Sequence, residues 1–261
     1  MPTGTRAVFV TPARLLGWST CVVALTVIEA WVRLAIVNPF LVPLPSAVGL
    51  SLGQLLIDGS VLQAFLLTVG EALIAAVLIA VIGLPLGLVL QRNITSRIAF
   101  EGWIAAAAAA PIALAYPLFL VLFGRSWMTA TAMGALAGLF PLTLKTLEGL
   151  AGTRRCLIDV GLNMGLDSRA MALKILLPAA APTIFVGLRL GMIFALINIV
   201  GLQFLINLDG LGQLINNMAE RYDLPGTYAA VLLVVAINVM FFVALEHLER
   251  RAVPSHSVAG E

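Results

Sequence analysis

The stretch VLQAFLLTVGEALIAAVLIAVIGLPLGLVLQ, residues 61–91, contains a single charged side chain, that of Glu71. A transmembrane α-helix needs about 20 consecutive, predominantly apolar residues to cross the hydrocarbon core of a bilayer. The stretch is longer than this and lacks the period-two alternation of a lipid-facing β-strand. Because lipid offers the backbone no hydrogen-bond partners, the stretch is predicted to be a membrane-spanning helix.

The composition of the whole chain agrees with a membrane protein. Of its 261 residues, 61% are hydrophobic and only 11% are charged, whereas soluble domains have about 45–50% apolar and about 25% charged residues. This balance argues against a soluble enzyme and a disordered chain. The net charge is only +2, and the sequence has no run of basic residues that could bind a phosphate backbone. No nucleic-acid partner is therefore expected.

Six apolar segments predict an all-α, polytopic membrane protein. They cover residues 15–37, 61–91, 98–123, 127–147, 179–204 and 226–248. They form one transmembrane domain, 15–250, with a cytoplasmic segment at 1–14 and a cytoplasmic tail at 251–261. About twelve Lys and Arg residues lie on the side that holds both termini and about three on the other, so the positive-inside rule makes the first side cytoplasmic.

Residues able to form a catalytic or metal site are scarce. The chain has two Cys and two His and no HExxH sequence. Neither Lys145 nor Lys174 follows a GxxxxG sequence, so there is no P-loop to hold a nucleotide. The sequence therefore predicts no catalytic residue, no metal site and no cofactor in this chain. If ATP drives the protein, a separate subunit must bind it together with Mg.

An internal loop at about 148–178 is longer than a connection between two spans requires. Within it, 154–166 has apolar positions at i, i+3, i+4 and i+7, which share one face of a helix. These positions are Leu157, Val160, Gly161 and Met164. Gly165 is predicted to end this helix, and Ser168 is predicted to cap a second helical stretch that ends at Pro178. The loop is either an ordinary membrane-surface segment or an element that docks into a groove of a soluble partner.

The spacing within the loop favours docking. The stretch Asp159-Val160-Gly161-x3-Gly165-x9-Ile175-x-Leu177-Pro178 resembles the EAA loop of bacterial ABC importer permeases, EAA-x3-G-x9-I-x-L-P. The acid of the triplet is retained and both alanines are changed. Four further stretches resemble the nitrate/sulfonate/taurine branch of these permeases. They are LPSAV at 44–48, PIALAYPLFLVLFG at 111–124, VGLR at 186–189 and GLGQLI at 210–215.

The resemblance implies a lipid-embedded permease subunit of an ATP-driven importer in the bacterial inner membrane. In such importers two identical or different permeases form the solute pathway, two ATPase subunits bind ATP and Mg, and a periplasmic or lipid-anchored binding protein delivers the solute. The residues then expected to couple this chain to the ATPase are Leu157, Asp159, Val160, Gly161, Leu162, Met164, Gly165, Ile175, Leu177 and Pro178. The permease itself is not expected to be an enzyme.

Three polar residues within the predicted spans are candidates for the solute pathway. Ionisable groups are costly in a membrane and indicate function by default. Glu71 is interpreted either as a pathway acid or as the partner of an arginine on a neighbouring helix or subunit. Asn198 and Gln203, in the fifth predicted span, either line the pathway or join helices through hydrogen bonds.

Two other functions remain open at this point. A secondary transporter would need no ATPase, but the docking-like loop would then have no role. An accessory permease would form half of a heterodimeric pore without a solute site of its own. The changed EAA triplet and the acid at Glu71, where related permeases usually have arginine, are compatible with such a pairing.

Overall fold

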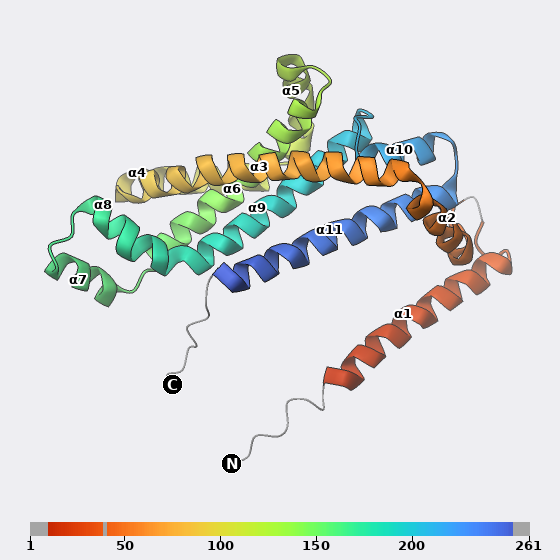
Figure 1. Ribbon diagram of the computed structural model, residues 1–261, viewed down its shortest axis with the longest axis horizontal. Coiled ribbons are helices and arrows are strands. Elements are labelled where there is room, and N and C mark those ends of the chain that lie inside the picture. Colours follow the sequence, from red (N-terminus) through yellow and green to blue (C-terminus); the bar gives the residue numbers. More distant parts are fainter. Residues whose placement is uncertain (1–9, 39–40, 253–261) are drawn as a thin grey trace, which may run out of the picture. The chain divides into compact units, whose positions relative to one another are not determined.

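The computed structural model describes residues 10–38 and 41–252, and their regular structure is helical, with no strand among them (Figure 1). The predicted all-α fold is therefore confirmed, whereas the predicted terminal segments 1–14 and 251–261 lie largely outside the described residues. The helices are α1 (Val10–Arg33), α2 (Pro45–Ile57), α3 (Gly59–Gln91), α4 (Ile94–Ala109), η1 (Ile112–Ala115), α5 (Tyr116–Phe123), α6 (Trp127–Ala151), α7 (Arg155–Asn163), α8 (Ser168–Met171), the π-helical η2 (Ala172–Leu176), α9 (Leu177–Leu205), α10 (Leu211–Glu220) and α11 (Leu224–Ala252). They form two compact units, one of residues up to 61 with Ile215–Leu233 and one of Leu62–Leu214 with residues from 234 onward.

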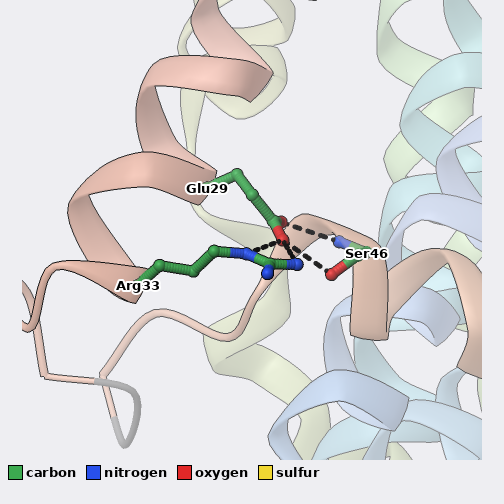
Figure 2. A network of polar contacts seen from close by, with 3 residues as sticks. All are labelled: Glu29, Arg33 and Ser46. Carbon is green, nitrogen blue, oxygen red and sulfur yellow. Dashed lines mark hydrogen bonds and ion pairs between the residues drawn. The ribbon is translucent and has the colours of Figure 1, made fainter.

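In the first unit, a polar contact joins α1 to the start of α2. Arg33 Nη2 lies 2.7 Å from Glu29 Oε1 in an ion pair one helical turn apart. The backbone N–H and the hydroxyl of Ser46 also donate to the Glu29 carboxylate, at 3.0 and 2.8 Å (Figure 2). Pro45 fills the first helical position of α2, where a missing N–H costs nothing. Glu29 thus fixes the angle between α1 and α2.

The second unit is built around α6 and α9, which lie side by side (Figure 1). A Cβ atom at Gly191 would lie 2.6 Å from the backbone oxygen of Gly138, so the two helices approach more closely than larger residues permit. Ile79 of α3, Leu142 of α6 and Ile199 of α9 are fully buried in one hydrophobic cluster. This cluster makes α3, α6 and α9 the rigid centre of the unit.

The number of spans differs from the prediction. Four helices in the described part of the chain are long and apolar enough to cross a membrane. They are Val61–Gln91, Trp127–Ala151, Ser168–Leu205 and Leu224–Ala244. A fifth span results if α4 and the segment Ile112–Phe123 are counted together, although they meet at 84°. The helix α1 is not among these spans, so the first of the six predicted spans stays a prediction.

The sharp bend in the predicted span 98–123 has a local cause. Pro111 has no N–H to donate and disfavours a helical conformation of the residue before it. Ala110 accordingly has an extended backbone, with ψ of 140°. In Figure 1, α5 turns away from the direction of α4. The segment predicted over 98–123 is therefore interrupted at Pro111.

Candidate functional site

The loop between α6 and α9 contains α7, which is shorter than the helix predicted over 154–166 (Figure 1). Gly165 has a φ of +66°, in the left-handed region that favours glycine. Its N–H donates to the Leu162 carbonyl at 3.0 Å, and the next N–H, of Leu166, donates to Gly161 at 3.1 Å. These two hydrogen bonds supply donors to carbonyl groups that have no partner within the last turn of the helix. Gly165 ends α7, as predicted.

Large apolar side chains of α7 are exposed at the surface of the second unit. The exposed fraction of the side chain is lowest for Leu157, at 41%, and highest for Met164, at 71%. Val160 and Leu162 lie between these values. Asp159 is exposed as well. Isolated apolar residues are ordinary on a protein surface, but Leu157, Val160 and Met164 share one side of this short helix and its cap and form a patch typical of an interaction site. We call these three residues the α7 apolar face.

Gly161 packs toward the chain instead. It is buried, and a Cβ atom there would lie 2.5 Å from Ile175 Cδ1 and 2.7 Å from Met171 Cε. The absence of a side chain at this position lets α7 lie directly against the helical segment that leads into α9. The structure thus brings the predicted coupling residues Gly161 and Ile175 into contact, although they are far apart in the sequence motif.

The segment after α7 differs from the prediction at two places. Asp167, rather than Ser168, caps α8, because its Oδ1 accepts a hydrogen bond from the Ala170 N–H at 2.9 Å. The predicted stop at Pro178 was wrong, since residues 168–205 form one continuous helical stretch. A π-helical turn precedes Pro178, and in it the Leu177 N–H donates to the Ala172 carbonyl. This wider pairing keeps the helix intact where the proline supplies no N–H.

A polar cluster lies near the other end of α9. Gln203 Nε2 donates to Glu71 Oε2 at 2.9 Å, so the structure brings these two predicted residues together. The side chain of Thr68 and the backbone N–H of Gly212 both donate to Gln203 Oε1, at 3.0 and 3.1 Å. The Leu211 N–H in turn donates to Thr68 Oγ1 at 2.9 Å. We call these residues the Gln203 cluster; it ties α3, α9 and the start of α10 together.

The cluster identifies a partner of Glu71 within this chain. Glu71 is 5% exposed and Gln203 is fully buried. Glu71 takes part in none of the ion pairs Glu29–Arg33, Arg97–Glu101 and Lys145–Glu148 of the described residues. Within the described residues, the partner of Glu71 is the neutral amide of Gln203, and an ion pair of Glu71 with an arginine stays a prediction.

Sequence reasoning missed two members of the cluster. Thr68 precedes Glu71 by three residues, a spacing that puts both side chains on one face of α3. The glycine-containing sequence at 210–212 was noticed as a loop motif, but not as a donor of backbone N–H groups to a buried side chain. The combination of a polar pair at i, i+3 with a glycine-rich turn was the available signal.

Asn198 lies apart from this cluster. Its Nδ2 donates to the Phe194 carbonyl of the preceding turn at 2.9 Å. It lines a cavity of about 490 Å³ together with residues 108–113 and Ala137. Glu71 lines a different cavity, of about 550 Å³. In the described part of the chain, no group of three His, Cys, Asp or Glu residues is arranged to hold a metal ion.

Comparison with known proteins gives consistent results. The sequence model of the family described as binding-protein-dependent transport system inner membrane component matches residues 79–254. The formylaminopyrimidine transport permease protein ThiX of Halalkalibacterium halodurans is 27% identical over 174 residues, which are 67% of this chain and 70% of the relative. The putative aliphatic sulfonates transport permease protein SsuC of Bacillus subtilis is 23% identical over 218 residues, 84% of this chain and 79% of the relative.

A solved structure has the same fold. A chain of the MetNI methionine ABC transporter in an inward-facing conformation matches with a TM-score of 0.65 at 18% sequence identity. The match covers 74% of this chain and 96% of that chain. At this identity the likeness concerns the arrangement of the helices.

Proposed function

Since the chain belongs to the family of binding-protein-dependent transport system inner membrane components and is the permease subunit of an ABC importer, we propose that α7 is the element that engages an ATPase subunit. The observation that carries this proposal is the α7 apolar face, whose large side chains are exposed while the neighbouring Gly161 is buried against the chain. A short amphipathic helix presented in this way fits a hydrophobic groove.

The predicted coupling residues then divide into two groups. The docking surface comprises Leu157, Asp159, Val160, Leu162 and Met164. The positioning group comprises Gly161, Gly165, Ile175, Leu177 and Pro178. The first group is exposed and available to a partner, whereas the second shapes α7 or connects it to α9.

The path of coupling follows from the packing. Gly161 lies against Ile175, and Ile175 belongs to a helical stretch that continues to residue 205. A displacement of α7 by the ATPase must therefore move the start of α9. Because α9 is packed closely on α6, the two helices would move together, as rigid-body rocking of a transporter requires. The α7 loop would face the cytoplasm, where most of the Lys and Arg residues are expected.

The remaining subunits follow from the family. An inner-membrane permease of this family works with ATPase and binding-protein partners. We propose two ATPase subunits that bind ATP and Mg, a second permease subunit, identical or different, and a periplasmic or lipid-anchored binding protein. This chain would hydrolyse no ATP itself. Its named relatives are associated with formylaminopyrimidine and with aliphatic sulfonates, which differ in charge and shape, so the relatives do not select one solute.

Replacing Gly165 by Val tests the positioning role. A β-branched residue held in the left-handed region costs about 1–3 kcal/mol, so α7 should lose its defined end and the apolar face its geometry. We expect ATPase co-purification to fall by about tenfold or more, since 1.4 kcal/mol corresponds to a factor of about ten. The matched control is Gly165→Asn, because asparagine tolerates this conformation. Normal ATPase association and uptake in the Val variant would contradict the assignment of this loop.

We further propose that Glu71 and Gln203 lie along the solute pathway, and that Asn198 lines it at a separate position. The Glu71→Gln variant keeps an oxygen that accepts the Gln203 hydrogen bond but removes the negative charge. We expect uptake to fall by about tenfold or more, from the loss of about 1.4 kcal/mol of interaction, with assembly of the complex retained. The measurement is solute uptake into vesicles, with Glu101→Gln on α4 as a control for neutralising a carboxylate elsewhere. Unchanged uptake in Glu71→Gln would exclude Glu71 from the pathway.

A further inference from the structure

The cavity lined by Glu71 has the size and lining of a small-molecule site. Its volume is about 550 Å³, within the range of about 300–1,000 Å³ typical of ligand pockets. Apolar residues such as Leu66, Ile74 and Leu208 form much of its wall. A few polar groups, among them Glu71, Arg125 and Asp209, converge on it. All lining residues belong to the second compact unit.

The ionisable groups that line this cavity are two carboxyl groups and one guanidinium. Arg125 is the one cation among the lining residues, and two of its N–H groups donate to the backbone. Its Nε donates to the Ile206 carbonyl at 3.0 Å, and its Nη2 donates to the Asn207 carbonyl. Neither Glu71 nor Asp209 takes part in an ion pair with another described residue. Two carboxyl groups thus line the cavity, and the one cation beside them donates to backbone carbonyls rather than to either of them.

Glu71 is held in position for a ligand. Gln203 binds its Oε2, and Gln203 is itself fixed by Thr68 and by the Gly212 N–H. A buried carboxylate without a cationic partner carries a desolvation cost of several kcal/mol, which a bound cation would offset. Trp127 lines the same cavity, and indole rings attract cations within about 6 Å of the ring centroid.

We propose that this cavity binds a molecule that carries a protonated nitrogen, an ammonium or amidinium group, on an apolar body, in preference to an anion of similar size. The proposal deepens the proposed function, because it rests on Glu71 belonging to the solute pathway. It names the substrate class that this part of the pathway accepts. Arg125 directs two of its N–H groups to backbone carbonyls, and the two carboxyl groups beside it repel the sulfonate or carboxylate group of a solute.

The test uses three probes of similar size: benzylammonium, benzyl alcohol and toluenesulfonate. The full chain is purified with its ATPase subunit, and Trp18, Trp31 and Trp103 are replaced by Phe, so that Trp127 is the remaining one of the four tryptophans. Its fluorescence is titrated with each probe. We expect a saturable change with benzylammonium and none with toluenesulfonate. Equal responses to all three probes would indicate partitioning into an apolar surface and would overturn the proposal.

Variants connect the signal to the carboxyl groups. Glu71→Gln should raise the benzylammonium midpoint by about tenfold, equivalent to about 1.4 kcal/mol, and Asp209→Asn should raise it severalfold. Glu101→Gln, outside the cavity, should leave it unchanged. If Glu71→Gln does not fold, Asp209→Asn decides the result, because Asp209 is exposed. Unchanged midpoints in the folded variants overturn the cation site, whereas ATPase association in the same preparations tests the proposed function separately.

Discussion

The Val160→Asp variant is expected to lose both its ATPase subunit and ATP-driven uptake, while its membrane-spanning helices stay folded. Val160 is 53% exposed on α7, so the substitution disturbs little within the chain. Burying a Val side chain at an interface contributes about 1.5–3 kcal/mol, and burying an unpaired carboxylate there costs more. Together these terms should weaken association by at least about a hundredfold, equivalent to about 2.8 kcal/mol.

The measurement is co-purification of the ATPase from membranes, together with ATP-dependent uptake and the thermal unfolding of the purified permease. Thr95→Asp is the matched control, because it adds the same charge at an exposed position in the first turn of α4. A carboxylate in that turn interacts favourably with the helix dipole. Full ATPase association in Val160→Asp would remove α7 as the docking element.

The α7 loop was the part of the molecule that the sequence described best. Apolar periodicity identified α7, and a glycine placed just after the last apolar position identified its end. Both signals are local, because helix formation and termination depend on residues a few positions apart. The cap of α8 was missed by one residue, since Asp167 and Ser168 are adjacent and both are suitable caps.

The continuous helix through Pro178 and the bend at Pro111 show where local reasoning ends. Proline disrupts regular helical pairing in both places. At Pro178 a π-helical turn restores a hydrogen bond and the helix continues. At Pro111 the chain changes direction by 84°. Which outcome occurs depends on the packing around each proline, which the sequence pattern does not reveal.

The Gln203 cluster was beyond sequence reasoning for a different reason. Its side-chain partners on α3 and α9 are more than 130 residues apart in the chain. Any polar residue of any span was a possible partner for Glu71, and charge complementarity favoured arginine over the amide of Gln203. Asn198 precedes Gln203 by five positions, a rotation of about 140° around a helix with 3.6 residues per turn. The two side chains of α9 therefore point to different neighbours.

The Gln203→Leu variant is expected to cause the largest loss of stability. Leucine fills a similar volume but leaves the buried Glu71 carboxylate and the Gly212 N–H without their partner. Leaving a buried polar group without its hydrogen-bond partner costs about 1–3 kcal/mol, and more when the group is charged. An ordinary hydrogen bond between membrane helices contributes only about 0.6 kcal/mol on average. The measurement is the free energy of unfolding, obtained by denaturant titration of the purified permease, which distinguishes the larger cost from the smaller one. A loss below about 1 kcal/mol would mean that Gln203 is an ordinary helix contact.

The double variant Gln203→Leu with Glu71→Leu distinguishes a structural from a functional role of the acid. Replacing both partners of a buried polar pair by apolar residues is often nearly neutral, so stability should return toward that of the unchanged protein. If Glu71 only joins α3 to α9, uptake should return with it. If Glu71 lines the pathway, stability returns and uptake does not, because the charge that meets the solute is gone. A double variant as unstable as Gln203→Leu alone would show that the uncompensated carboxylate was not the source of the loss.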